Sequence, residues 1–126
     1  MRRPFIVFLA TVCCLSISCG PKPLPNDKLV FVGQWEAHSG FTIDIKANGT
    51  AELTQYLDHT DPDYERLCIK VGPPIIKDIP LTFKGDDVLE VSKTMLYART
   101  YKIEQPPYQD GDHIKMVLNG VTLIKQ

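Results

Sequence analysis

Apolar and polar residues alternate along most of the chain after residue 27. The clearest case is residues 41–46, which read Phe-Thr-Ile-Asp-Ile-Lys. A period of two indicates a strand with one face in the core and the other in water. Similar short runs recur to the end of the chain, and none forms a convincing amphipathic helix. We expect strands over residues 29–36, 41–46, 50–57, 66–71, 75–84, 88–91, 97–104, 113–118 and 121–125.

Two Asn-Gly pairs predict hairpins whose register follows from the apolar pattern. A three-residue loop, Ala47-Asn48-Gly49, pairs Ile43 with Leu53, whereas a two-residue loop would mix core and solvent faces. Asn119-Gly120 fits a two-residue turn, which pairs Leu118 with Val121. Both hairpins are therefore expected to be antiparallel and half-buried.

Prolines predict where strands end or become irregular. Pro80 lies inside the run 75–84, so that strand is expected at an edge or with a bulge. Pro73-Pro74 and Pro106-Pro107 are expected to end the strands before them, and residues 92–96 could form one helical turn.

Eight or nine short strands, with turns at intervals of roughly ten residues, indicate an all-β domain. Sequential hairpins favour a small antiparallel up-and-down β-barrel over a sandwich, because closure removes exposed edges. The 126 residues allow one such domain, over residues 28–126.

The first 18 residues have the pattern of a signal peptide. Arg2 and Arg3 precede an uncharged apolar run, 5–15, which is too short to span a bilayer as a mature helix. Small residues, 16–18, then lead to Cys19. Residues 1–18 are therefore expected to be removed.

Leu15-Ser16-Ile17-Ser18-Cys19 resembles the lipobox of bacterial lipoproteins. The resemblance implies cleavage before Cys19, acylation of its thiol and amine by fatty acids such as palmitate, and a membrane anchor in the cell envelope. Gly20, where Asp would retain an enterobacterial lipoprotein in the inner membrane, implies the outer membrane, with the domain at its periplasmic or surface face. Secretion without lipid remains the alternative. Residues 19–27 then comprise the lipidated cysteine and a proline-rich tether, which would hold the domain roughly 20 Å from the headgroups.

Charge and cysteine content exclude several classes of protein. The chain has 14 basic and 15 acidic side chains and no clustered basic face, so no nucleic-acid partner is expected. Cys68 is the one cysteine within residues 28–126, so no internal disulfide is possible. We expect Cys68 to be a small residue on a strand.

Gly33-Gln34-Trp35, followed by a series of hairpins, resembles the lipocalin and fatty-acid-binding proteins. The resemblance implies that Trp35 packs at the base of the barrel under the core. The second lipocalin motif is not intact, because Thr60-Asp61 is separated from Tyr64. The short chain implies that any internal cavity is small or filled by side chains.

Tyr97, Arg99 and Tyr101 share one face of a strand with Ile103, which suggests that they point inward. An inward arginine requires a partner. Arg99-x-Tyr101 resembles the pair by which fatty-acid-binding proteins hold a carboxylate, and it implies a ligand site formed by Trp35, Tyr97, Arg99 and Tyr101. A structural contact of Arg99 on Trp35 as a cation–π pair, or simple exposure, are the alternatives.

The acidic loop 58–65 could hold a divalent cation, although its spacing fits no calcium-loop motif and a solvated loop is the simpler interpretation. No catalytic, phosphate-binding or zinc pattern is present in the sequence, so we expect no enzyme, no metal and no cofactor. The expected function is a lipid-anchored extracytoplasmic binding protein for a small amphipathic or acidic ligand. The alternative is a protein-binding module, namely an envelope accessory protein or an inhibitor of an extracytoplasmic enzyme.

Overall fold

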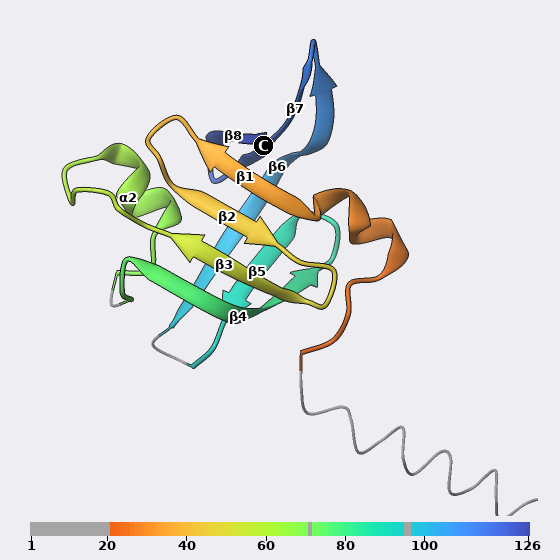
Figure 1. Ribbon diagram of the computed structural model, residues 1–126, viewed down its shortest axis with the longest axis horizontal. Helices are drawn as coiled ribbons and strands as arrows, with labels where there is room; N and C mark the ends of the chain where they lie inside the picture. Colours follow the sequence, from red (N-terminus) through yellow and green to blue (C-terminus); the bar gives the residue numbers. More distant parts are fainter. Residues whose placement is uncertain (1–20, 71, 95–96) are drawn as a thin grey trace, which may run out of the picture.

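A computed structural model describes residues 21–70, 72–94 and 97–126 of the chain. Eight antiparallel strands are each paired with the next, and β1 pairs with β8, so the sheet closes into a barrel (Figure 1). This confirms the prediction of an all-β, up-and-down, lipocalin-like barrel. The strands are β1 (Gly33–Ala37), β2 (Thr42–Ile45), β3 (Thr50–Thr54), β4 (Ile75–Lys84), β5 (Val88–Ser92), β6 (Ala98–Asp110), β7 (His113–Leu118) and β8 (Val121–Lys125).

Two short helices accompany the barrel. The 3-10 helix η1 (Asn26–Phe31) precedes β1, and α2 (Pro62–Leu67) lies between β3 and β4. Within the ranges given above, neither helix has the length and apolar character needed to cross a membrane. The expected signal peptide, 1–18, and Cys19 lie outside the described residues.

Inward-facing side chains from all eight strands form one continuous core. Phe41, Ile43 and Ile45, the apolar half of the alternating run, are each at most 1% exposed. Trp35 and Tyr101 are the largest of the fully buried side chains. The core is therefore built by strand alternation, as the sequence predicts, and aromatic and branched side chains fill it.

Both hairpins have the predicted register. Ile43 pairs with Leu53 across the first, and Leu118 pairs with Val121 across the second. Asn119 and Gly120 have φ angles of 49° and 80°, which a tight two-residue turn between twisted strands requires. The Asn119 side chain supports this conformation, because its Oδ1 accepts a hydrogen bond of 2.8 Å from the backbone N–H of Lys102.

Strand β4 contains the predicted irregularity. Its pairing with β3 shifts between Ile76 and Ile79, and Asp78 in between has a φ of 55°. Pro80 follows this bulge and pairs with Thr50, at the point where β4 stops pairing with β3 and begins pairing with β5. The strand is thus bulged but not at an edge, since the barrel is closed.

The prediction of a strand over 66–71 is wrong, so the barrel has eight strands rather than nine. Helix α2 occupies part of this segment: Asp61 caps it by accepting a 2.9 Å hydrogen bond from Asp63 N–H, and Pro62 is its first residue. The residues after it, Leu67 to Ile69, are all buried. Three consecutive buried residues do not alternate as a half-buried strand would, so this backbone packs as a loop, in which the Ile69 N–H donates to the Gln55 side chain at 2.7 Å.

Among the strand boundaries, the largest differences from expectation are at β1 and β6. Residues 26–31 form η1, so the first strand begins at Gly33 rather than at residue 29. Strand β6 runs through Pro106-Pro107 to Asp110. The prolines are tolerated for two reasons: β5 stops pairing with β6 at Lys102, and the pairing of β6 with β7 on its other edge shifts between Gln105 and Tyr108. The expected helical turn, 92–96, includes residues 95 and 96, which are not described, while β5 continues to Ser92.

Candidate functional site

Trp35 is completely buried and closes the end of the barrel beside η1. Its indole Nε1 donates a hydrogen bond of 2.8 Å to the carbonyl of Phe31, in the last residue of η1. Lys125 Nζ lies 5.8 Å from the centre of a Trp35 ring. Gly33, with a φ of 141°, leaves room for this lysine, because a Cβ there would lie 2.6 Å from Lys125 Cε. Trp35 therefore joins η1, β1 and β8.

Arg99 and Tyr101 point inward from β6, as the alternation predicts, and both hydrogen-bond to the end of α2. Arg99 Nη2 donates to the carbonyls of Glu65 and Arg66, each at 2.6 Å. The Tyr101 hydroxyl donates to the carbonyl of Leu67 at 2.6 Å. The last carbonyls of a helix have no partners within the helix, and a cation is favoured at this end by the helix dipole.

The predicted contact of Arg99 on Trp35 is replaced by these bonds. The cation that lies over Trp35 is Lys125, whereas the Arg99 guanidinium is directed to α2. Burial raises the pKa of the Tyr101 hydroxyl, although the nearby Arg99 cation opposes the shift. Tyr101 thus remains a neutral donor to the Leu67 carbonyl at physiological pH.

Tyr97 lies just before β6 and is half-buried. Its backbone N–H donates to Thr94 Oγ1 at 3.2 Å, and its carbonyl accepts from the Lys93 N–H at 2.8 Å. These bonds close the loop between β5 and β6. The four residues expected to share a ligand site are therefore divided: Trp35 contacts η1, Arg99 and Tyr101 contact α2, and Tyr97 bonds within the loop between β5 and β6.

Cys68 and the acidic loop have local structural roles. Cys68 is the residue that ends α2 rather than a strand residue, and burial raises the pKa of its thiol to about 11. The Asp58 carboxylate accepts from the Thr60 N–H at 3.1 Å, and this bond lowers the pKa of Asp58. Throughout the described part of the chain, no cluster of three His, Cys, Asp or Glu residues is arranged to hold a metal ion.

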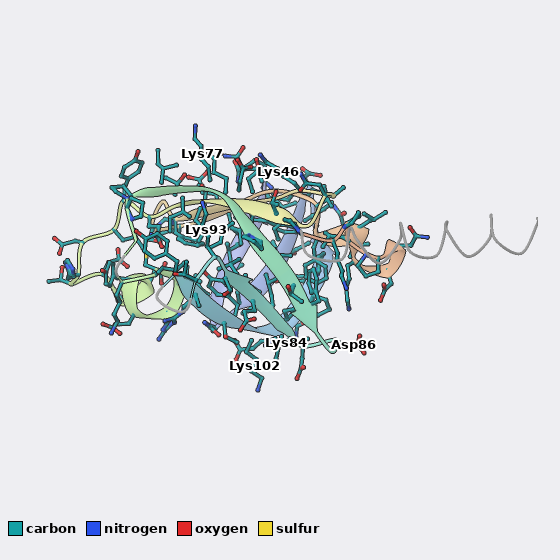
Figure 2. All side chains as sticks on the ribbon, turned by 90° about the horizontal axis from the view of Figure 1, so that it is seen from below. Lys46, Lys77, Lys84, Asp86, Lys93 and Lys102 are labelled. Atoms are coloured by element: carbon teal, nitrogen blue, oxygen red, sulfur yellow. The ribbon has the colours of Figure 1, made fainter. Side chains whose placement is uncertain are left out.

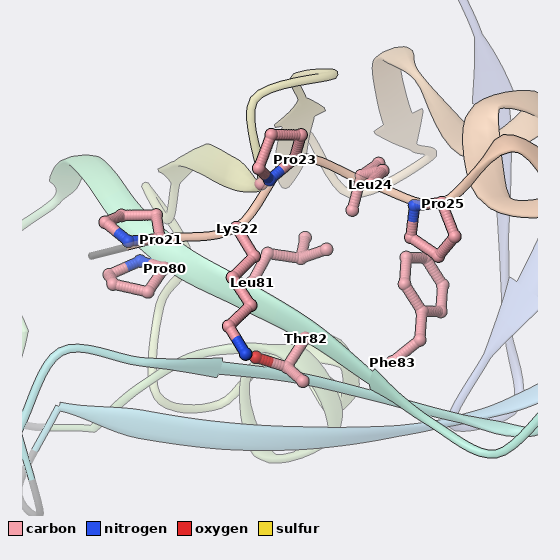
Figure 3. Close-up of a pocket in the computed structure, with 10 residues that line it drawn as sticks. Pro21, Lys22, Pro23, Leu24, Pro25, Pro80, Leu81, Thr82 and Phe83 are labelled. Atoms are coloured by element: carbon pink, nitrogen blue, oxygen red, sulfur yellow. The ribbon is translucent and has the colours of Figure 1, made fainter. Parts of the chain in front are cut away.

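A groove of about 630 Å³ lies on the outside of the barrel, between the amino-terminal segment and β4 (Figure 3). Its apolar lining comes from prolines, Leu24 and two β4 side chains, whereas Lys22 and Thr82 supply an ammonium and a hydroxyl group. The lining residues are Pro21, Lys22, Pro23, Leu24, Pro25, Gly49, Pro80, Leu81, Thr82 and Phe83.

The segment that forms one wall of this groove is fixed to the barrel. The Leu24 N–H donates to the carbonyl of Ala47 at 2.9 Å, and the Leu24 side chain is 9% exposed within the core cluster. The carbonyl of Lys22 packs against Gly49, at a place where a side chain on residue 49 would overlap it. Residues 22–24, expected to be part of a free tether, are instead held at the loop between β2 and β3.

The other wall is supported by aromatic contacts. Phe83 packs against Phe31 of η1 with a ring-centre distance of 4.8 Å, and Lys28 Nζ lies 5.4 Å from the centre of the Phe83 ring. Figure 3 shows the ring of Pro25 next to that of Phe83. The end of the groove at Phe83 therefore lies against η1. Figure 3 shows the Lys22 side chain reaching toward Thr82, with Pro21 and Pro80 at the opposite end.

Sequence reasoning did not identify this groove, because a proline-rich segment is typical of an extended linker. Leu24 was the available signal, since it is an apolar residue between two prolines that already restrict the backbone. Comparison with protein-family models, with curated proteins and with solved structures gave no match. The function is therefore argued from the geometry of this chain.

Proposed function

We propose that the protein is a lipid-anchored, extracytoplasmic binding protein that holds a small amphipathic molecule in the groove beside β4. The observation that carries this proposal is the groove itself. Its volume of about 630 Å³ lies within the range of roughly 300–1,000 Å³ found for small-molecule sites, which are likewise mostly apolar with a few polar groups.

The lining indicates the chemistry of the ligand. Phe83 and the exposed prolines of residues 21–25 offer apolar surface for an acyl chain or an aromatic ring, and Lys22 offers a cation for an acidic head group. The Lys22 ammonium forms no ion pair with any described residue, so it is available to a carboxylate or phosphate. The proline walls are already restricted in conformation and lose little entropy on binding.

The anchor in this proposal is Cys19, which lies two residues before the first described residue. The resemblance of residues 15–19 to a lipobox supports it, together with the charged and apolar pattern of residues 1–18. The protein would then act at the surface of a bacterial envelope membrane, without chemistry of its own. Incorporation of an alkyne fatty acid in wild-type cells, and its loss in Cys19→Ser, tests this part.

Displacement of a fluorescent fatty acid tests the ligand site. Thr82→Trp places a large ring in the groove, and the exposed Thr100 of β6, where the same substitution can be made, provides a matched control. We expect Thr82→Trp to weaken binding of the probe at least tenfold and Thr100→Trp to leave it unchanged. Equal binding by both variants would exclude the groove as the site.

A second candidate function, binding of an envelope protein, is favoured by a different surface. Strands β6 and β7 project beyond the barrel, and a hollow of about 320 Å³ lies between them and η1. Val30 and Tyr108 in this hollow are 57% and 37% exposed. Exposed apolar side chains grouped in this way are typical of protein interaction sites. A photocrosslinking residue at position 108 should give a discrete protein adduct that Val30→Asp abolishes.

A further inference from the structure

The place where the amino-terminal segment joins the barrel limits how far the barrel can lie from a membrane anchor. Leu24 is fixed by its hydrogen bond to Ala47 and by burial, and the carbonyl of Lys22 is in contact with Gly49. Among the described residues, residue 22 is therefore the first whose backbone is seen in contact with the barrel. The chain between Cys19 and this position consists of Gly20 and Pro21.

The length of this short connection limits the distance between Cys19 and the barrel. Consecutive Cα atoms are at most ~3.8 Å apart, so the Cα atoms of Cys19 and Lys22 are separated by no more than ~11 Å. The polar layer on each side of a bilayer is about 5–8 Å thick. If Cys19 carries a lipid, the barrel therefore cannot lie roughly 20 Å from the headgroups, as it could on a free tether.

We propose that the groove side of the barrel, formed by residues 21–25, the loop 47–49 and the outer face of β4, lies in contact with the phospholipid leaflet that holds Cys19. This inference rests on the proposed lipid anchor and identifies the partner of the surface as the bilayer. An amphipathic ligand would then enter the groove from the membrane rather than from water.

The surface chemistry fits contact with headgroups. Figure 2 views the side on which β4 is in front, with Lys77 and Lys84 of that strand among the labelled residues. Lys84 is paired with Glu90 at 3.2 Å, whereas Lys22 and Lys77 have no ion-pair partner among the described residues. Asp86, labelled in the same view, is also exposed, so charge alone would bind this side to a membrane only weakly. The short connection, rather than charge, is what holds the surface at the membrane.

The far side of the molecule supports the same orientation. In Figure 1 the chain enters the barrel at the lower right, and the β6–β7 hairpin ends at the top of the view. Asp112, in the turn of that hairpin, is exposed. The hairpin therefore projects away from the membrane, where a residue at its tip can serve as a water-exposed reference.

Spin labels measure this orientation directly. The full chain is expressed, isolated from the membrane fraction and reconstituted in vesicles of phosphatidylethanolamine and phosphatidylglycerol. Labels are attached to Thr82→Cys or Lys84→Cys, which are both exposed on β4. A label on Asp112→Cys, also exposed, is the control. Native Cys68 is 1% exposed and should not react. We expect the ratio of relaxation by oxygen to relaxation by a water-soluble nickel chelate to be several-fold higher at both β4 positions than at position 112.

The outcomes distinguish the inference from the proposal on which it rests. If the protein is bound to the membrane but the β4 labels are as accessible to nickel as the label at position 112, the proposed orientation is wrong and the anchor stands. If the wild-type chain is not in the membrane fraction, or incorporates no alkyne fatty acid, the lipid anchor itself is wrong and the proposed orientation is wrong with it.

Discussion

The hydroxyl of Tyr101, in the middle of β6, donates a hydrogen bond of 2.6 Å to the carbonyl of Leu67 at the end of α2. Both residues are completely buried, and 34 positions of sequence separate them. Arg99, two residues earlier on the same face of β6, donates to the two preceding carbonyls. Together these bonds attach α2 to the barrel. They satisfy the buried Tyr101 hydroxyl, whereas Arg99 Nε is buried without a partner among the described residues.

Tyr101→Phe removes the hydroxyl and leaves the buried Leu67 carbonyl without this donor. We expect the free energy of unfolding to fall by about 1–3 kcal/mol, the cost of a buried unsatisfied polar group. Urea denaturation measures the change. Tyr56, which is 66% exposed, is the matched control, and Tyr56→Phe should stay within about 0.5 kcal/mol of wild type. Equal effects of the two substitutions would contradict a structural role for the Tyr101 hydroxyl.

Arg99→Ala separates the structural role of this arginine from a role in ligand binding. The Glu65 carbonyl loses a charged donor, whereas the Arg66 carbonyl still accepts from Asn119 Nδ2. Because these carbonyls are exposed and water can replace the donor, the free energy of unfolding should fall by about 0.5–1.5 kcal/mol. Binding of the fluorescent fatty acid should be unchanged in the folded fraction, because Arg99 does not line the groove. Lys102 is an outward-facing cation on the same strand, and Lys102→Ala controls for the loss of charge. A selective loss of binding in Arg99→Ala would restore the carboxylate-anchor hypothesis.

The thiol of Cys68 gives a pH dependence of stability with a defined sign. Burial raises its pKa from 9.0 to about 11, so between these values the native state keeps a proton that the unfolded state releases. The contribution is complete below pH 9 and is lost as the pH rises to about 11. Urea midpoints across this range should therefore fall more steeply for wild type than for Cys68→Ala. Parallel pH profiles would show that the thiol does not titrate differently in the two states.

Gly49→Ala tests the attachment of the amino-terminal segment. The backbone at Gly49 has a φ of 88°, and an added Cβ would also overlap the Lys22 carbonyl. Gly40, with a φ of 101° and nothing within 4 Å of an added Cβ, is a matched control. In Gly40→Ala the free energy of unfolding should fall only by the backbone strain of about 1–2 kcal/mol. Gly49→Ala should be less stable than Gly40→Ala and should also exchange the Leu24 amide proton faster and bind the fatty-acid probe more weakly. Identical behaviour of the two variants would show that the segment is not held at Gly49.

The barrel was largely predictable because its signals are local. Alternation places Phe41, Ile43 and Ile45 on one face whatever the rest of the chain does, and the turn at Asn119-Gly120 requires backbone angles that few other residues tolerate. The wrong strand prediction arose where a local pattern was compatible with two kinds of structure. Residues 66–71 alternate like a strand, but the cap at Asp61 and the proline after it begin a helix instead.

The candidate site depended on contacts that no local pattern contains. Alternation correctly turned Arg99 and Tyr101 inward, but it could not say that α2, rather than Trp35 or a ligand, would supply the acceptors. Composition likewise indicated an extended proline-rich segment at residues 21–25 without indicating what covers it. That Leu24 enters the core was decided by the space beside the loop 47–49.

By itself, the sequence determined the class of fold, the register of both hairpins and the inward face of each correctly predicted strand, since these follow from the two-residue period of a strand and the backbone needs of a turn. Only the tertiary structure decided which carbonyls Arg99 and Tyr101 contact, and that the amino-terminal segment forms a wall of a groove. The physical reason is that a side chain's direction is a local property, whereas its partner is set by elements distant in the chain that meet only when the barrel closes.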